Sequence, residues 1–349
     1  MKRELADELL CVLKEYKALR IAEQIDFQKF CLYSIIAHST AIEGSTVTEI
    51  EAQLLFDEGI TSGKRTLTEQ LMNLDLKAAY EYGMEWIKRH APITVDWLVT
   101  LASKVMAHTG SEYHAMGGDF SAAKGELRKL NVTAGIGGKS YMSYQKVPAK
   151  LAAFCEELNK RRREINASDI CAVYDLSFWA HYELVTIHPW ADGNGRTSRL
   201  LMNLLQMEYG ALPTKVLKEE RSEYIQALKD SRDGEDVDVF INCVSGLHLR
   251  HLRSDINQYV KSTTYTTVDK KGLKQEMVDK WSIKPSLAEK LVDILGFVAD
   301  KDEITTEEII RQFGFTATTA KRYLRQLTEF GYLTAQGGNK NRTYKVINQ

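Results

Sequence analysis

The sequence predicts a mainly α-helical protein with a β-hairpin on its helical body and a small C-terminal domain of three helices and a second hairpin. Apolar residues recur at spacings of three and four along most of the 349 residues, and only five residues are prolines. Residues 131–144 instead place β-branched and aromatic residues around Gly137-Gly138, which is typical of a hairpin. The helical rhythm changes again at Pro285, where the C-terminal domain is expected to begin.

Helices are predicted over most of the chain before residue 263. Thr94 and Ser168 are expected to cap two of them, because each precedes a helical segment with acids in its first turn. The predicted ranges are 2–24, 26–42, 67–90, 94–108, 147–165, 169–187, 195–209, 219–231 and 236–262.

The C-terminal pattern is that of a winged helix-turn-helix, in which three helices precede a hairpin. Helices are expected at 286–299, 305–312 and 316–330, and strands at 332–334 and 343–346. The domain boundaries that follow are an N-terminal helical region at 1–110, a central core at 111–262, a connector at 263–284 and the winged helix at 285–349.

Composition excludes several classes of protein. A net charge of −1 gives no overall field that would attract nucleic acid or an anionic membrane. No segment has the length of a signal peptide core or of a membrane span. The five cysteines are widely spaced and form no CxxC pair, so a reducing cytoplasm is the expected location.

Residues 188–199 carry the chemistry of a phosphate site. This stretch, HPWADGNGRTSR, lies between two predicted helices. Gly193 and Gly195 allow the backbone to approach a ligand closely, and the N-terminus of the following helix attracts anions. Asn194 can cap that helix or donate to a phosphate oxygen. An Asp-Gly-Asn-Gly segment alone is more often a plain turn, but here it stands within a longer set of constrained positions.

The remaining residues of the stretch add charge and a base. Arg196 and Arg199 are three residues apart on the predicted helix, so their forked donors share one face. Asp192 offers one carboxylate, which together with substrate phosphates is the usual set of ligands for Mg²⁺. His188 can accept a proton from an attacking hydroxyl. Together they predict phosphoryl or nucleotidyl transfer.

This stretch resembles the motif HPFx(D/E)GNGRxxR of the Fic family, with Trp190 in place of the usual phenylalanine. Gly125, Arg128 and Val147-Pro148 also resemble the region of the family's hairpin, the flap. The resemblance covers roughly residues 30–260 and implies a Fic-type helical bundle. We expect the flap to clamp an extended protein substrate by strand addition.

The resemblance also implies an activity, the transfer of AMP from ATP to a tyrosine, serine or threonine hydroxyl of a protein. His188 would be the catalytic base and Asp192 the ligand of Mg²⁺. Tyr224 is similar to a family position that lines the adenine pocket, although a core tyrosine is an equal alternative. The ATP and phosphate ligands implied are Gly193, Asn194, Gly195, Arg196, Arg199 and Tyr224.

A second stretch, Ser39 to Gly44, is similar to the inhibitory motif (S/T)xxxE(G/N) found in Fic proteins. The resemblance implies an inhibitory helix at about 26–44, whose Glu43 pairs with Arg199 in the place of the γ-phosphate. The alternative is a solvated glutamate at a helix end.

Other functions remain open on the sequence alone. The same fold can remove AMP or transfer another phosphate-containing group, and self-modification is included among the expected reactions. Residues 305–349 hold seven basic side chains against three acids, so the winged helix can bind DNA or, alternatively, a protein partner. A transcription regulator that only senses nucleotide is the rival from another class, and a homodimer is left open.

Overall fold

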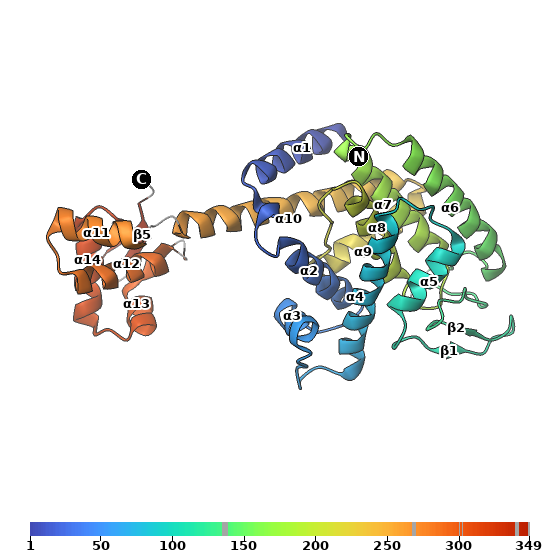
Figure 1. Cartoon of the computed structure of the whole chain (residues 1–349), viewed down its shortest axis with the longest axis horizontal. Coiled ribbons are helices and arrows are strands. Elements are labelled where there is room, and N and C mark those ends of the chain that lie inside the picture. Colours follow the sequence, from blue (N-terminus) through green and yellow to red (C-terminus); the bar gives the residue numbers. More distant parts are fainter. Residues whose placement is uncertain (135–138, 267–269, 300, 302, 339–341, 348–349) are drawn as a thin grey trace. The chain divides into compact units, whose positions relative to one another are not determined.

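The computed structural model describes residues 1–349 except 135–138, 267–269, 300, 302, 339–341 and 348–349. The chain divides into two compact units, Met1–Arg253 and Ser254–Gln349, and their boundary falls within helix α10, Val237–Thr266 (Figure 1). The mainly helical fold class is confirmed.

The first unit is a helical bundle with few strand residues. A two-residue strand pair, β1 (Glu112–Tyr113) and β2 (Phe120–Ser121), is antiparallel. The other helices of this unit are α1 (Arg3–Ala18), η1 (Ile21–Glu23), α2 (Phe27–Ile42), α3 (Glu49–Glu58), α4 (Leu67–Ile87), α5 (Val95–Val105), η2 (Tyr144–Lys146), α6 (Val147–Glu164), α7 (Ile170–Ile187), α8 (Asn194–Glu208), η3 (Lys218–Glu220) and α9 (Arg221–Gly234).

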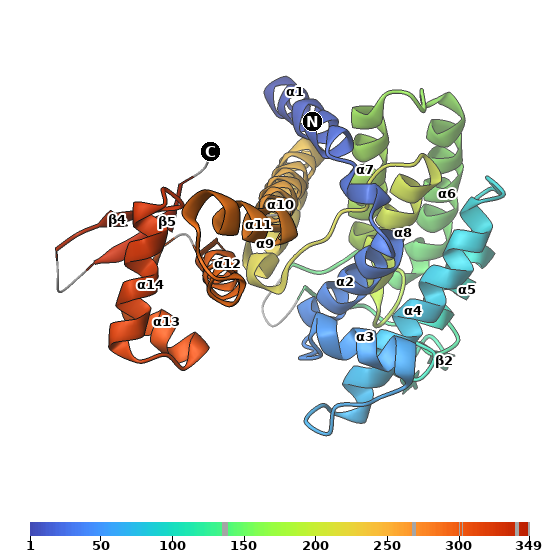
Figure 2. The ribbon, with the colours of Figure 1, turned by 60° about the vertical axis from the view of Figure 1, so that its left-hand side comes forward.

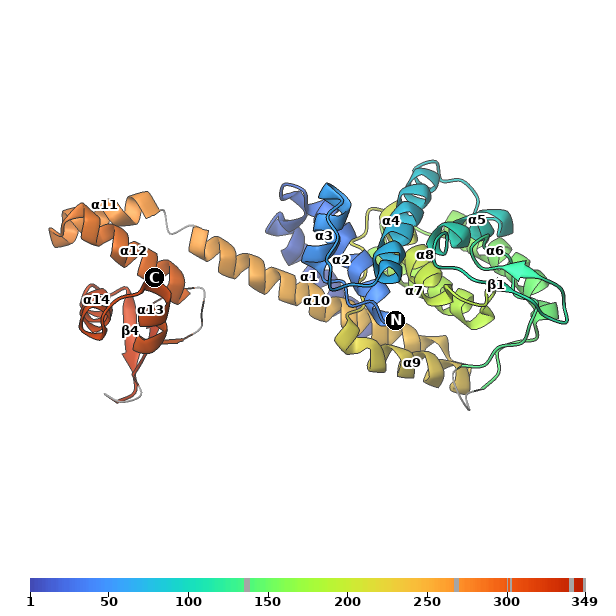
Figure 3. The same cartoon turned by 90° about the horizontal axis from the view of Figure 1, so that it is seen from below.

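Helix α8 is the centre of this bundle. It packs against α7, α4, α5 and α2 (Figures 1 and 3). Twelve of its fifteen residues are buried, including Arg196 and Arg199. Polar groups at the start of α8 are therefore held in a desolvated place, where their electrostatic interactions are strong.

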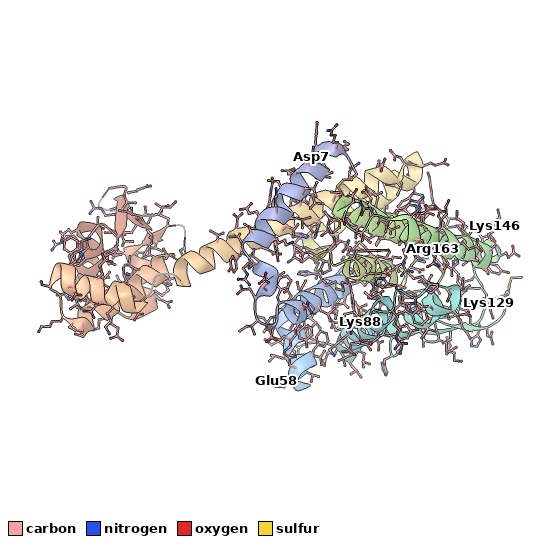
Figure 4. All side chains as sticks on the ribbon, turned by 45° about the horizontal axis from the view of Figure 1, so that its top comes forward. Asp7, Glu58, Lys88, Lys129, Lys146 and Arg163 are labelled. Atoms are coloured by element: carbon pink, nitrogen blue, oxygen red, sulfur yellow. The ribbon has the colours of Figure 1, made fainter. Side chains whose placement is uncertain are left out.

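Helix α2 follows α1 and precedes α3 in the chain. In Figure 4, Asp7 marks α1 and Glu58 marks the end of α3. The buried residues of α2 include Ile35, Ile36 and Ile42, so one face of α2 belongs to the core. Helix α3, which the sequence analysis did not predict, begins with a capping box between Thr48 and Glu51. A helix of ten residues is too short to show a clear apolar period.

Two local predictions need correction. The helix expected at 2–24 is interrupted, because Arg20 adopts a left-handed backbone (φ 54°) between α1 and η1. Asp169, not Ser168, caps α7, since its carboxylate accepts a bond from the backbone N–H of Ala172 at 3.1 Å. Thr94 caps α5 as predicted, accepting a bond from Trp97.

The two arms of the predicted hairpin at 131–144 run antiparallel. Thr133 and Ser140 form an isolated bridge, and the backbone N–H of Tyr141 donates to the carbonyl of Val132. The Gly137-Gly138 turn lies outside the described residues.

The second unit has the order of a winged helix. Its sheet has the antiparallel order β3-β5-β4, and α14 packs against β4 (Figure 2). Leu324 of α14 and Tyr344 of β5 belong to one core. Its elements are α11 (Lys270–Trp281), α12 (Pro285–Ala299), β3 (Ile304–Thr305), α13 (Thr306–Phe313), α14 (Ala317–Glu329), β4 (Leu333–Gln336) and β5 (Thr343–Val346).

The predicted connector at 263–284 is largely helical, which corrects that interpretation. Helix α10 continues to Thr266, and α11 packs against α12. Met277 of α11 is fully buried in the core of this unit. Leu273, Met277 and Trp281 do recur at a helical spacing of four, and the sequence analysis missed this short pattern. In the described part of the chain, no helix is long and apolar enough to cross a bilayer.

Candidate functional site

The site begins where α7 ends. His188 follows Ile187 in a left-handed conformation (φ 53°, ψ 61°), which turns the chain into the loop before α8. Arg128 fixes this turn from the base of the flap. Its Nε donates to the carbonyl of His188 at 2.8 Å, and its backbone N–H donates to the carbonyl of Pro189 at 2.9 Å. His188, the candidate base, and the flap are thereby joined through one buried guanidinium.

Trp190 anchors the loop in the core. It is only 1% exposed, and its indole N–H donates to the carbonyl of Gly125 at 2.9 Å. The Asn194 side chain bonds both backbone groups of Trp190, accepting at 3.1 Å and donating at 2.8 Å. Asn194 therefore closes the loop, and its phosphate-binding role stays a prediction.

The N-terminus of α8 is open. Gly193 precedes it with φ 81°, and no side chain caps the helix within the described structure. A Cβ at Gly193 would lie 2.7 Å from the Met106 sulfur, and a Cβ at Gly195 would lie 2.5 Å from a Glu43 carboxylate oxygen. These glycines allow neighbouring groups to approach the helix end closely, as expected of an anion site.

Arg196 is buried beside this opening. Its Nη2 lies 3.6 Å from an Asp192 oxygen and 3.0 Å from the Met106 sulfur. Its Nε and Nη1 are buried and have no hydrogen-bond partner among the residues described. Burial lowers the pKa of Arg196, although Asp192 and Glu43 act in the opposite direction. A buried guanidinium with unpaired nitrogens is costly unless an anion binds it, so Arg196 fits a phosphate ligand.

Arg199, one turn further along α8, is by contrast fully engaged. Its Nη2 donates to Glu43 at 2.6 Å, and its Nε donates to the Ser39 hydroxyl at 2.9 Å. Its Nη1 lies 3.5 Å from the Tyr224 hydroxyl. The structure thus brings Glu43 and Arg199 together, although they are 156 positions apart in the chain.

Glu43 ends α2 at this contact, with 35% of its side chain exposed. Partial burial raises the pKa of its carboxyl, but the nearby guanidinium groups outweigh burial, with Arg199 the strongest, and hold the pKa below its usual value. The carboxylate is therefore charged at neutral pH. Arg221 also holds the end of α2 in place, because its Nε donates to the carbonyl of Ile42 at 2.9 Å.

Tyr224 is 1% exposed, and its hydroxyl lies 2.7 Å from Nε2 of the buried His181. The same hydroxyl lies 3.5 Å from Nη1 of Arg199, so Tyr224 contacts this guanidinium from within the core. Its predicted place in an adenine pocket is not tested by these contacts.

His188 is held as a neutral imidazole. Burial lowers its pKa to about 4, with Arg128 and Arg232 acting in the same direction against the Val185 carbonyl and Asp192. The ring stacks on Tyr141 of the flap, with centroids 3.9 Å apart and planes at 19°. A neutral imidazole is the form that accepts a proton.

Asp192 is the candidate metal ligand, with 57% of its side chain exposed. Its Oδ1 accepts a bond from the Gly193 N–H at 2.6 Å. No group of three or more histidine, cysteine, aspartate or glutamate side chains forms a metal site in the described residues. A single accessible carboxylate beside a phosphate site fits Mg²⁺, which takes its other ligands from phosphates and water.

Sequence analysis did not identify the contacts of Tyr141, Arg221 and His181 with the site. Each depends on a contact between distant segments, and no local pattern marks such a residue. For Tyr141, the sequence showed that it lies in the predicted flap, but not that it contacts His188.

Known families match both units. Residues 92–206 match the model of the Fic/DOC family, and residues 287–337 match that of the IclR helix-turn-helix domain. The chain is 29% identical over 241 residues to "Protein adenylyltransferase Fic" of Drosophila erecta, and 28% identical to the Drosophila melanogaster protein of the same name. Each alignment covers 68% of this chain and 44% of the relative, so the chain spans less than half the length of these proteins.

Solved structures show the same fold. A Fic domain containing signaling protein from Bacteroides thetaiotaomicron aligns with a TM-score of 0.59 and 21% identity, over 72% of this chain and 97% of that one. A Fic family protein from Desulfovibrio desulfuricans aligns with a TM-score of 0.55 and 17% identity, over 100% and 97% of the two chains. The chain is therefore similar to the Fic/DOC family over residues 92–206 and to the IclR helix-turn-helix domain over residues 287–337.

Proposed function

We propose that this chain transfers AMP from ATP to a tyrosine, serine or threonine hydroxyl of a protein and releases pyrophosphate. The observation that carries the proposal is a neutral, half-buried His188 beside an uncapped helix end, where Arg196 keeps two nitrogens without a partner among the described residues. A base next to a phosphate cradle is what nucleotidyl transfer requires. The relatives named as protein adenylyltransferases support the same reaction.

The residues would act as follows. The α8 N-terminus and Arg196 bind the phosphates of ATP, and His188 removes the proton of the acceptor hydroxyl. The hydroxyl oxygen attacks the α-phosphorus as the bond to pyrophosphate breaks. Asp192 would hold Mg²⁺, which neutralises phosphate charge when bound.

Glu43 would keep this site at rest. Its carboxylate occupies Arg199, the guanidinium that would otherwise hold the γ-phosphate. Transfer then requires that Glu43 leave Arg199, since the triphosphate must be aligned for in-line attack. The support is the 2.6 Å ion pair at a buried arginine.

The test is incubation with α-labelled ATP, Mg²⁺ and a cell lysate, comparing Glu43→Gly with Glu43→Gly/His188→Ala. Label on protein that depends on His188 supports AMP transfer. The mass added to the labelled protein separates AMP from UMP, phosphate and phosphocholine. Loss of label from pre-modified protein on incubation with the unmutated chain would favour AMP removal instead.

A second candidate function belongs to the C-terminal unit. Lys321 and Arg322 on α14 and Arg342 and Lys345 on the wing are exposed, whereas Lys340 lies outside the described residues. Basic side chains on these elements suit duplex DNA. A gel shift of the whole chain at several salt concentrations tests it, with Arg322→Glu as the variant and Lys290→Glu on α12 as the control. A cytoplasmic location and a homodimer stay predictions.

A further inference from the structure

A buried carboxylate on α4, outside the stretch at 188–199, fixes the turn that follows α5. Asp75 is buried, and both of its oxygens contact His108. One oxygen lies 2.6 Å from the ring Nδ1, and the other accepts a bond from the His108 backbone N–H at 2.9 Å. Helices α4, α5 and α8 pack against one another (Figure 3), so this turn is attached to α4 beside the start of the site helix.

The same turn carries Met106 to the proposed phosphate site. Met106 ends α5, and its sulfur lies 3.0 Å from Nη2 of Arg196. A Cβ at Gly193 would lie 2.7 Å from this sulfur, and Met106 is only 1% exposed. Close packing of this kind transmits a displacement of the turn to its neighbours. The place of Met106 against Arg196 therefore depends on the bonds between Asp75 and His108.

Met106 contacts Arg196 through an uncharged atom. A thioether sulfur is a weak acceptor, so it can direct one nitrogen of the guanidinium and leave the positive charge to a ligand. Asp192 lies further from the same nitrogen, at 3.6 Å. Arg199 differs, because the carboxylate of Glu43 accepts its Nη2 at 2.6 Å. With Nη2 held by the sulfur, Nε and Nη1 of Arg196 have no partner in the described part of the chain and are left for phosphate oxygens.

Asp75 also acts on Arg196 through its charge. Burial lowers the pKa of Arg196, and the charges of Asp192, Glu43 and Asp75 act in the opposite direction. Because the Asp75 oxygens accept from His108, this carboxylate favours the charged guanidinium without occupying its donors.

We propose that Asp75 is a positioning residue of the phosphate site. Through His108 it holds the turn that sets Met106, and Met106 directs Nε and Nη1 of Arg196 toward the phosphates of ATP. The inference rests on the proposed function and adds to it three residues that lie outside the motif at 188–199. Loss of the Asp75 carboxylate would weaken the binding of ATP through Arg196.

The experiment measures the Kd of ATP by calorimetry on the full chain, with Glu43→Gly in every variant so that Arg199 is free. We expect Asp75→Asn to raise this Kd by about tenfold, the size of a lost hydrogen bond to a charged group. Met106→Leu removes the sulfur at similar volume and should raise the Kd by a smaller factor. Asp96→Asn, at an exposed position at the start of α5, is the matched control and should leave the Kd unchanged.

A double-mutant cycle separates positioning from a general loosening of the fold. If Asp75 acts through Arg196, Asp75→Asn should have little further effect on the Kd of ATP once Arg196→Ala is present. A merely structural role would weaken ATP binding by the same factor in both backgrounds. The affinity for inorganic tripolyphosphate, which has no base or ribose, should fall with Asp75→Asn as the affinity for ATP does.

Each failure has its own meaning. Additive effects in the cycle, or the same Kd for Asp75→Asn and its Glu43→Gly parent, overturn the inference and leave the proposed function standing. No ATP binding by the Glu43→Gly parent contradicts the proposed function itself. If Asp75→Asn fails to fold by circular dichroism, the same cycle with His108→Ala and Met106→Leu tests the inference, because both keep the bond from the backbone N–H of residue 108 to Asp75.

Discussion

Helix α8 in the first unit and helix α14 in the second both begin with free backbone N–H groups, but only α14 has a side chain that caps them. The Thr316 hydroxyl accepts a bond from the backbone N–H of Thr319 at 3.3 Å. At α8 a glycine stands at the capping position, and no described side chain closes the helix end. A capped end satisfies its own donors, whereas an open end in a buried place is available to a ligand.

The comparison extends to charge. The α14 basic side chains are exposed, but Arg196 and Arg199 of α8 are 2% and 3% exposed. Water screens exposed charges, so they steer a partner and contribute little individually. Buried charges need a specific counter-ion. Glu43 provides one for Arg199, and the two nitrogens of Arg196 without a partner among the described residues fit the proposed phosphate ligand.

The largest expected effect comes from removing the base at the open helix end. His188→Ala should lower the rate of AMP transfer by about 10²–10⁴-fold. Nucleotide binding should be largely retained, because the phosphate contacts come from other residues. Single-turnover kinetics and ATP titration measure the two separately. Transfer at close to the original rate would exclude His188 as the base.

The next effect concerns the counter-ion of Arg199. Glu43→Gly should raise the initial transfer rate by roughly tenfold or more. Arg199 would then be free to hold the γ-phosphate, and correct alignment of the triphosphate can lower the barrier by several kcal/mol. Arg199→Ala should not be activated, because it removes the anchor of the γ-phosphate together with that of Glu43.

Both variants are measured at saturating ATP, with Glu49→Gly at the exposed start of α3 as the control. Equal rates for Glu43→Gly and the unmutated chain would exclude the inhibitory role. Activation by Arg199→Ala would mean that Glu43 acts through another partner.

The pH dependence is a smaller effect. The folded pKa of His188, about 4, is below the value near 6.5 of an unperturbed histidine. The neutral base is therefore present at pH 7 and is lost only as the pH falls toward 4. The acid limb of kcat/KM for Glu43→Gly should lie below pH 6. An acid limb at 6.5 or above would contradict the buried environment of His188.

The smallest effect tests the capped helix. Thr316→Ala should lower the free energy of unfolding of the C-terminal unit by about 0.5–2 kcal/mol. AMP transfer should not change, because this hydroxyl serves only the helix. Thermal melting and a transfer assay on the same preparation check both parts. Thr318→Ala, at an exposed position on α14, is the control for helix propensity.

Much of the site lies in one continuous stretch, and this made it predictable. The chemistry of residues 188–199 needs only local geometry, because a loop and the first two turns of α8 hold all twelve residues. The Glu43–Arg199 contact was expected only through resemblance, since nothing in the spacing of two distant residues indicates that they meet. The contacts of Tyr141 with His188 and of Arg221 with Ile42 depend on packing between separate segments. Tertiary contacts decided these features, and local propensity did not.

Gly195 determines how the proposed resting state would be lost through mutation. The space that a side chain would take at this residue is held by a Glu43 oxygen, 2.5 Å from the expected Cβ. If Glu43 inhibits as proposed, a larger residue would push it away and relieve inhibition, but it would also obstruct the backbone proposed to bind the phosphates. On this proposal, a substitution at Gly195 would harm catalysis as it removes control, whereas one at Glu43 would remove control alone. Under selection, constitutive activity would arise far more readily through position 43 than through position 195.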